Sequence, residues 1–271
     1  MRDECMDRSS PGRAGLLAEG DPPPFEVVNP SGRGPMVLTC DHASHAVPAA
    51  LDGLGLDSAD LRRHIGWDAG AAELARRLSR RFDAPAVLSG YSRLVIDCNR
   101  SPGHPESILA ESDGTPVPGN QGLTPEEAER RAQALFHPYH EAVAGVLDSI
   151  GSRGESPAYV ALHTFTPNMN GMARPWHFGV LWDHDPRIAR PLIEALRRRP
   201  GLIVGDNEPY SGRDHGAFSN GHHATPAGLP NAMIEIREDL LADEAGIARC
   251  EGILAGVLEE VLAPGPREEE R

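Results

Sequence analysis

Short apolar runs alternate with helical patterns along most of the chain. A short apolar run bounded by turn residues favours a buried strand, and apolar residues that recur every three or four positions favour an amphipathic helix. The runs predict strands over residues 36–40, 85–88, 94–98, 158–162, 178–182, 202–204 and 233–237. The helical patterns cover residues 67–81, 124–150, 187–199 and 243–262. Strands that alternate with helices predict an α/β protein with helices on both faces of one sheet.

The clearest element boundary lies at Thr124. A threonine cap followed by Pro125 at the first helical position and Glu127 at the third is typical of a capping box. An apolar stripe then continues from Ala128 to Ile150, so the pattern predicts one long helix.

The two ends of the chain differ from its body in composition. Residues 1–24 are polar and rich in proline, glycine and charge, and they predict a disordered N-terminal arm. Residues 263–271 have the same character and predict a flexible tail. Residues 25–262 show neither an internal repeat nor a convincing linker, so we expect them to form one domain.

Composition excludes several classes of partner and mechanism. The net charge of −14 makes the chain a poor ligand for nucleic acid phosphates. All 26 basic residues are arginines, which excludes a Schiff-base or general-base lysine. No run reaches the roughly 18 apolar residues of a membrane span, and residues 1–24 lack the apolar segment of a signal peptide. With its four scattered cysteines, the chain is expected to be cytoplasmic, with no membrane or nucleic acid partner.

Two histidines lie at the ends of predicted strands. His42 follows residues 36–40, and His163 follows residues 158–162. Ligands collect at the carboxyl ends of strands in such sheets, so we expect the two imidazoles at one edge. Two imidazoles, a carboxylate and an open water position make a catalytic zinc site, and Asp68 is the candidate carboxylate. Alternatively, Asp68 caps the helix that begins there, and each histidine is a satisfied buried imidazole.

Glu235 lies within an apolar strand pattern, where a carboxylate is unfavourable unless it is paired or functional. It is therefore a candidate base for the attacking water of a zinc hydrolase. Two structural alternatives remain open. Glu235 could face solvent on an edge strand, or it could pair with Arg237, whose side chain points to the same face.

The predicted strand 94–98 leads into Asn99 and Arg100. An arginine fork beside an amide donor suits capture of a substrate carboxylate. The alternative is an arginine that ties a loop to backbone carbonyls.

A series of short segments, taken together, resembles the N-formylglutamate amidohydrolase family. The segments occur in the expected order at residues 41–48, 67–71, 97–100, 163–167, 174–181, 205–210, 223–224, 228–230 and 235–237. Any one of these motifs is weakly specific, but the ordered set is strongly specific. The resemblance covers about residues 25–262.

The resemblance implies a zinc carboxypeptidase-like fold, with a mixed β-sheet between helices in a single three-layer α/β domain. It also implies zinc-dependent cleavage of an N-acyl bond on an acidic amino acid. The substrate would be N-formyl-L-glutamate, a small molecule converted to formate and glutamate in histidine degradation. By the same resemblance, His42, Asp68 and His163 hold one Zn²⁺ per chain, although other divalent metals suit the same ligands.

The family also suggests roles around the metal. Glu235 resembles the carboxylate that activates the water, and Asn99 and Arg100 resemble the pair that holds the substrate carboxylate. A substrate with two carboxylates needs a second cation, for which Arg93 and Arg237 are candidates. His223 and Arg174 are candidate donors to the oxyanion, with a loop-stabilising histidine and a surface salt bridge as the alternatives.

One departure from related sites concerns the position three after His42. Carboxypeptidase-like sites often hold a glutamate there, whereas this chain has His45, so either Asp68 or His45 completes the metal site. The segment around His42 also differs from that of histidine-degradation enzymes, which leaves another N-acyl amino acid open as substrate. Competing functions are a zinc carboxypeptidase, a deacylase for another acyl group, or a non-catalytic binding relative. The absence of a GxSxG motif disfavours a serine hydrolase.

Overall fold

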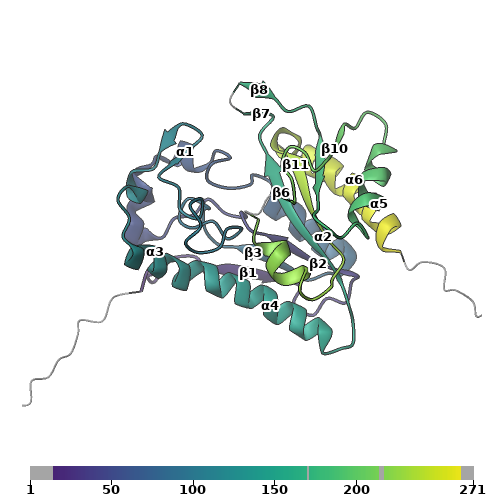
Figure 1. Cartoon of the computed structure of the whole chain (residues 1–271), viewed down its shortest axis with the longest axis horizontal. Coiled ribbons are helices and arrows are strands. Elements are labelled where there is room, and N and C mark those ends of the chain that lie inside the picture. The colour runs from purple at the N-terminus through teal and green to yellow at the C-terminus, as the bar shows by residue number, and fades with distance from the viewer. Residues whose placement is uncertain (1–14, 170, 214–216, 264–271) are drawn as a thin grey trace, which may run out of the picture.

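A computed structural model describes residues 15–169, 171–213 and 217–263 (Figure 1). Its centre is a seven-stranded sheet in the order β1-β3-β2-β6-β11-β9-β10. The strands are β1 (Phe25–Val28), β2 (Met36–Cys40), β3 (Ala86–Ser89), β6 (Ala158–Phe165), β9 (Phe178–Leu181), β10 (Val204–Asp206) and β11 (Asn231–Arg237). The strands β3, β2, β6 and β11 are parallel, so their carboxyl ends meet at one edge. β1 is antiparallel to β3, and β9 is antiparallel to β11, which makes the sheet mixed.

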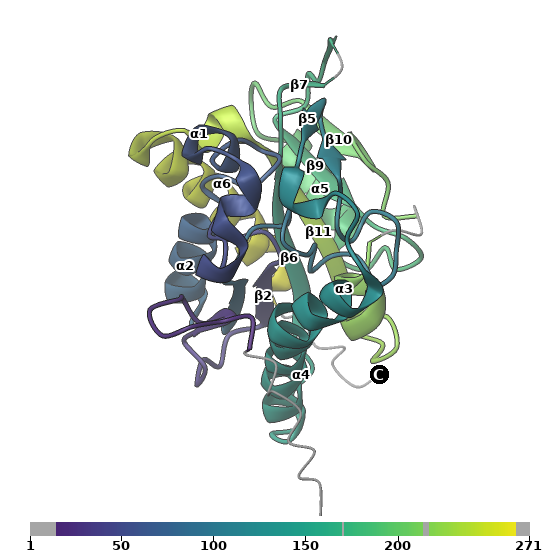
Figure 2. The ribbon, with the colours of Figure 1, turned by 90° about the vertical axis from the view of Figure 1, so that its left-hand side faces the viewer.

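Helices cover both faces of the sheet. One face carries α2 (Ala71–Phe82), α5 (Ala189–Arg197) and α6 (Glu244–Leu262). The opposite face carries α4 (His137–Gly151), and Figure 2 shows α2 and α6 on the other side of the strands from α4. This arrangement is the three-layer mixed α/β fold that the sequence predicts.

Side-chain alternation explains why each strand serves both layers. In β2, Met36 and Leu38 belong to the apolar cluster of α2 and α6, whereas Val37 belongs to the cluster of α4. In β6, Val160 belongs to the cluster of α2 and α6, and Tyr159 belongs to the cluster of α4. Both faces of the central strands are therefore apolar, as expected for parallel strands that are covered on each side.

Shorter elements complete the domain. They are the helices α1 (Ser58–Leu61) and α3 (Pro125–Arg131), and the small hairpins β4 (Glu111–Ser112) with β5 (Thr115–Pro116) and β7 (Asn168–Met169) with β8 (Met172–Ala173). Short 3₁₀-helical segments lie at Ala49–Gly55, which contains a kink, and at Pro118–Asn120 and Glu238–Leu241, and single turns of π-helix lie at Ala132–Phe136 and Asn220–Ala224.

The predicted strand over residues 94–98 is wrong. These residues form turns and irregular loop, and Leu94, Val95 and Ile96 are buried in a third cluster with Leu135 and Phe136. Their hydrophobicity therefore reflects a buried loop rather than a sheet pairing. Asn99 and Arg100 consequently lie in a turn rather than at the end of a strand.

Several predicted boundaries also shift. β10 begins only at Val204, and Ile203 before it is about half exposed. β6 continues through His163 to Phe165, so His163 lies within the strand rather than after it. The long predicted helix is confirmed with its capping box at Thr124, but a π-helical turn separates α3 from α4. The edge strand β1 was not predicted.

The N-terminal segment differs from the predicted arm over the part that the structure describes. Leu16 is 2% exposed, and the backbone of Pro22 and Pro24 accepts hydrogen bonds from Tyr91 and Gly90. Residues 15–24 therefore pack on the domain. Residues 1–14 and 264–271, on which the rest of the predicted arm and most of the predicted tail fall, lie outside the described residues. Among the described helices, none is both long and apolar enough to cross a membrane.

Candidate metal centre

Three side chains from separate elements meet near the carboxyl edge of the sheet. His42 lies just beyond β2, Asp68 lies in the turn before α2, and His163 lies in β6. The backbone N–H of Asp68 donates to the carbonyl of His42 at 2.9 Å, which holds this turn against the end of β2. Gly70 lets the turn enter α2, because its φ is +81° and a Cβ there would lie 2.6 Å from the Cβ of Leu241.

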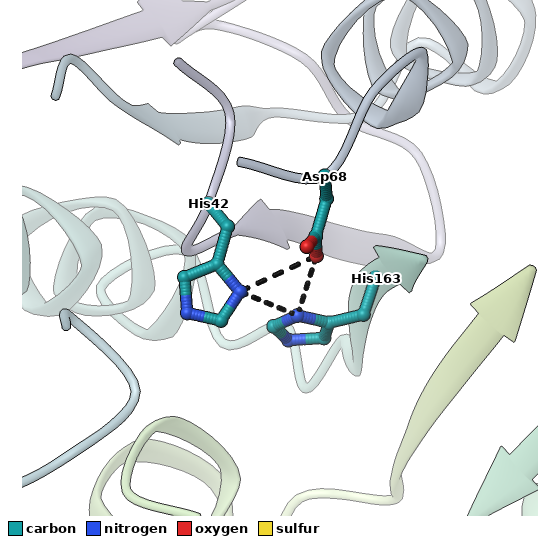
Figure 3. Close-up of side chains that lie close together, drawn as sticks. All are labelled: His42, Asp68 and His163. Carbon is teal, nitrogen blue, oxygen red and sulfur yellow. Dashed lines mark hydrogen bonds and ion pairs between the residues drawn. The ribbon is translucent and has the colours of Figure 1, made fainter. Parts of the chain in front are cut away.

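The three side chains point toward one common centre (Figure 3). Nδ1 of His163 lies 3.2 Å from Nδ1 of His42 and 3.0 Å from Oδ2 of Asp68. The third side of the triangle, from Nδ1 of His42 to Oδ2 of Asp68, is 3.3 Å. All three residues are at most 3% exposed.

The outer nitrogens of both imidazoles face buried carboxylates. Nε2 of His42 lies 2.7 Å from Oδ1 of Asp97, and Nε2 of His163 lies 3.3 Å from Oδ2 of Asp41. Asp41 is itself held by hydroxyl hydrogen bonds from Tyr139 and Ser219. A carboxylate beside Nε2 favours the tautomer that keeps the proton there, which leaves the Nδ1 lone pair directed inward.

This arrangement fits a divalent metal ion. With both protons on Nε2, two nitrogen lone pairs and one carboxylate oxygen converge without a hydrogen between them. A tetrahedral ion with bonds of about 2.0–2.1 Å would separate neighbouring ligand atoms by about 3.3 Å, close to the observed triangle. Among the described residues, His42, Asp68 and His163 form the cluster of metal-ligating side chains.

Electrostatics keeps the Asp68 carboxylate ionised, as a metal ligand requires. Burial raises the pKa of Asp68, but the imidazoles of His42 and His163 outweigh burial and hold that pKa below its usual range. Burial likewise lowers the pKa of His163, but Asp41 and Asp68 outweigh it and raise that pKa well above its usual range. A metal ion at this centre would therefore displace a proton from His163 when it binds.

The alternatives for Asp68 and His45 are resolved by position. The N-cap of α2 is Gly70, so the side chain of Asp68 does not cap that helix. His45 packs against Trp67 with tilted rings whose centroids are 4.7 Å apart, and it is not part of the metal-ligating cluster. Asp68 is therefore the residue that completes the candidate metal centre.

Glu235 faces the same cavity as the triad. β11 lies between β6 and β9, so Glu235 is not on an edge strand, and Arg237 pairs with Asp239 at 2.7 Å instead. Both structural explanations for Glu235 are therefore wrong. Glu235 is 5% exposed, and burial raises its pKa to about 7. A carboxyl group that titrates near neutrality can both accept and release a proton.

The register of the sheet places Glu235 beside the triad. It lies opposite His163 on the parallel strand β6 and opposite Gly179 on β9. A Cβ at Gly179 would lie 2.0 Å from the carbonyl oxygen of Glu208, so only glycine lets the loop approach there. The strand pairing and this close approach together fix the wall around Glu235.

Asn99 and Arg100 line the same cavity, which has a volume of about 510 Å³. Nε of Arg100 donates to Glu106 at 3.0 Å, and Nη1 of Arg100 donates to the carbonyl of Asn99. Oδ1 of Asn99 accepts from the backbone N–H groups of Phe218 and Ser219. The amide of Asn99 thus organises the turn, while Arg100 offers its guanidinium at the cavity wall.

Comparison with known proteins identifies the family. The family model described as N-formylglutamate amidohydrolase matches residues 34–242. The chain belongs to this family. A gene product of Agrobacterium tumefaciens has a solved structure that is 35% identical, with a TM-score of 0.88, and the match covers 92% of this chain and 98% of that one. An N-formylglutamate amidohydrolase from Ralstonia eutropha shares the fold at 20% identity and a TM-score of 0.68, over 88% of this chain and 97% of that one. A search of curated proteins gave no significant match.

The other candidate residues of this N-formylglutamate amidohydrolase family member occupy different places. Arg93 lines the cavity and donates to Asp97 at 3.0 Å. Arg174, Arg237 and His223 do not line that cavity. Arg174 donates to the hydroxyl of Tyr210, which does line it. Arg237 donates to Asp239, and His223 pairs with His140 at 2.9 Å.

Sequence reasoning assigned no role to the supporting carboxylates Asp41 and Asp97. Each lies in a motif that resembles the family, beside or after a candidate ligand or substrate contact, so their positions carried a signal. Tyr210 is a further missed residue of the cavity wall. Burial raises its pKa, and the neighbouring Glu235 raises it further, so the phenol stays protonated and can donate.

Proposed function

We propose that the protein is a zinc amidohydrolase that cleaves N-formyl-L-glutamate, or a related N-acyl amino acid, to the acyl acid and the free amino acid. The observation that carries this proposal is the buried triangle of His42, Asp68 and His163 in one cavity with Glu235. Family membership supports hydrolysis of an amide, and the donor set of two imidazoles and one carboxylate is typical of catalytic zinc.

When bound, zinc supplies Lewis acidity and lowers the pKa of a coordinated water toward about 7. The protein's own residues account for proton movement and orientation. Glu235 accepts a proton from the attacking water and passes it to the nitrogen of the breaking C–N bond. Its pKa of about 7, raised by burial, suits both halves of this transfer.

The guanidinium of Arg100 holds a carboxylate of the substrate, which takes the place of the exposed Glu106 carboxylate as its partner. Asn99 keeps Arg100 and residues 218–219 in place through its backbone carbonyl and side-chain oxygen. The substrate is then fixed at one end by an ion pair while its amide lies near the triad and Glu235. Such fixed orientation is a large part of the advantage of an enzyme over solution.

The decisive experiment is glutamate release from N-formyl-L-glutamate by the purified protein, with a chelator and with zinc returned. We expect activity that the chelator removes and zinc restores, with about one zinc per chain by metal analysis. Absence of both activity and bound metal would contradict the proposed metal centre. Bound zinc without release would contradict the formylglutamate assignment.

A cavity of about 510 Å³ is larger than a formyl group needs, which favours including other acyl groups in the assay. A panel of N-acetyl, N-succinyl and N-formyl amino acids and small peptides separates the alternatives. Preference for a larger acyl group would identify a deacylase, and cleavage of peptides a carboxypeptidase. Metal binding without turnover of any member would identify a binding relative.

A further inference from the structure

N-formylglutamate carries two carboxylates, so a site that prefers it needs two cationic contacts. Arg100 supplies one. Arg93 also lines the cavity, but its guanidinium already donates to Asp97 at 3.0 Å and lies 3.6 Å from Asp68. Its charge is therefore balanced by two buried carboxylates, and a substrate carboxylate would have to compete with both.

A second cavity of about 210 Å³ adjoins the first. The two cavities share a wall formed by Leu181, Gly212, Ala217 and Met233. Arg213 lines the second cavity and is absent from the lining of the first. The second cavity thus extends the site beyond the triad and ends in a different arginine.

The strand register gives the path between the two cavities. Met233 lies two residues before Glu235 on the same face of β11, and it pairs with Leu181 of β9. A substrate side chain that leaves the site past Glu235 therefore runs over the apolar pair of Met233 and Leu181. Methylene groups suit this surface, and the charged end would reach toward Arg213.

Within the part of the chain that the structure describes, the guanidinium of Arg213 has no anionic partner and can therefore bind an anionic ligand. It lies over the ring of Trp182 at 5.1 Å, and no carboxylate of the described chain is within ion-pair distance of it. Asp183, which lines the same cavity, lies 3.2 Å from His184 instead. Stacking on an indole orients a guanidinium while leaving its N–H donors at the edge free to bind a carboxylate.

We propose that Arg213 binds the side-chain carboxylate of the substrate, and that it selects N-acyl derivatives of acidic amino acids over those of neutral ones. This inference rests on the proposed function and goes further by assigning the second carboxylate contact. Arg100 holds the carboxylate common to all N-acyl amino acids, and Arg213 reads the side chain.

The test compares N-formyl-L-glutamate with its neutral isostere N-formyl-L-glutamine. We expect the wild type to show at least about a tenfold higher kcat/KM for the glutamate compound, since a site built for a polar group rejects an analogue that lacks it. In Arg213→Gln this ratio is expected to fall at least about tenfold, through a higher KM for the glutamate compound. Arg213→Lys keeps the charge but loses the planar fork of donors, so it is expected to retain only part of the preference, between those of the wild type and Arg213→Gln. Because the ratio is measured within one protein, it does not depend on the folded fraction.

The matched control is Arg190→Gln. Arg190 lies over the same indole at 5.4 Å but lines neither cavity, so its loss is expected to leave the ratio unchanged. A ratio that is the same in wild type and Arg213→Gln, or that falls equally in Arg190→Gln, would overturn the inference while the proposed function stands. Failure of the zinc-loaded wild type to cleave either compound would overturn both together.

Discussion

The protein contains two pairs of buried histidines whose surroundings give them opposite properties. Nδ1 of His42 and Nδ1 of His163 lie 3.2 Å apart, and each ring has a carboxylate at its outer nitrogen. In the second pair, Nδ1 of His140 lies 2.9 Å from Nε2 of His223. The outer nitrogen of His140 lies 2.8 Å from the carbonyl oxygen of Cys98, so its neighbour is a neutral group.

The pKa values follow these neighbours rather than burial alone. Burial lowers the pKa of all four histidines, yet Asp41, Asp68 and Asp97 outweigh it for His42 and His163, whose pKa values are raised. His140 packs against Phe136 and His223 stacks on Tyr159, and burial lowers the pKa of each histidine to about 4. In this protein, the pair surrounded by carboxylates belongs to the candidate metal centre, and the pair without them forms a neutral core contact.

The largest expected difference between the pairs is in metal binding. His163→Asn removes a ligand, so zinc content is expected to drop from about one per chain to near zero. Loss of a residue that hydrogen-bonds to a metal ligand lowers activity about 10–100-fold, and loss of the ligand itself is expected to lower it further. His223→Asn is expected to keep about one zinc per chain, because His223 pairs with His140 and is not one of the clustered ligands. Metal analysis of both purified variants decides this, and full zinc in His163→Asn would contradict the centre.

Glu235 separates metal binding from chemistry at the first pair. In Glu235→Gln, kcat is expected to fall about a hundredfold to ten-thousandfold, because the amide cannot take the proton of the attacking water. Zinc content is expected to stay near that of the wild type, since Glu235 is not one of the clustered ligands. Steady-state rates with matched metal analysis test this. Unchanged turnover would remove Glu235 from the mechanism.

A milder change would make the first pair resemble the second. Asp97→Asn leaves an amide beside His42 and removes an ion-pair partner of Arg93. We expect zinc affinity to weaken about 10–100-fold, because outer carboxylates fix the tautomer and increase the basicity of a ligating imidazole. Competition with a chromogenic chelator measures this affinity. Asp239→Asn, whose carboxylate pairs only with Arg237 among the described residues, serves as the control and is expected to bind zinc normally.

The sequence predicted the parts of this site that depend on strand pattern. His42, His163 and Glu235 belong to buried strands or their ends, and parallel strands bring such residues together whatever the loops do. Asp68 could not be distinguished from a helix cap until the structure showed Gly70 at that position. The strand predicted over residues 94–98 was wrong, because burial of a loop and burial of a strand leave the same apolar run.

The identity of neighbours across the chain was the least predictable feature. His223 was a candidate oxyanion donor by its motif, yet it pairs with His140, 83 residues away along the chain. Arg237 was a candidate substrate contact, yet it binds Asp239 two residues along. Which side chains pair depends on differences of an ångström or less in how the elements pack. No local pattern in a single sequence encodes such differences.

The smallest expected effect is the acid sensitivity of the second pair. A histidine whose pKa is about 4 when folded and about 6.5 when unfolded stabilises the fold fully above about pH 6.5. That contribution is lost as the pH falls toward 4, because the unfolded chain then binds more protons. For one protonation this loss amounts to about 2 kcal/mol between pH 7 and pH 5.

The double variant His140→Gln/His223→Gln should lack this loss of stability. Urea unfolding of both proteins at the two pH values, with chelator throughout, isolates the pair, because other titrating groups cancel in the difference. Equal losses in the two proteins would show that the pair is protonated, or solvated, in the folded state.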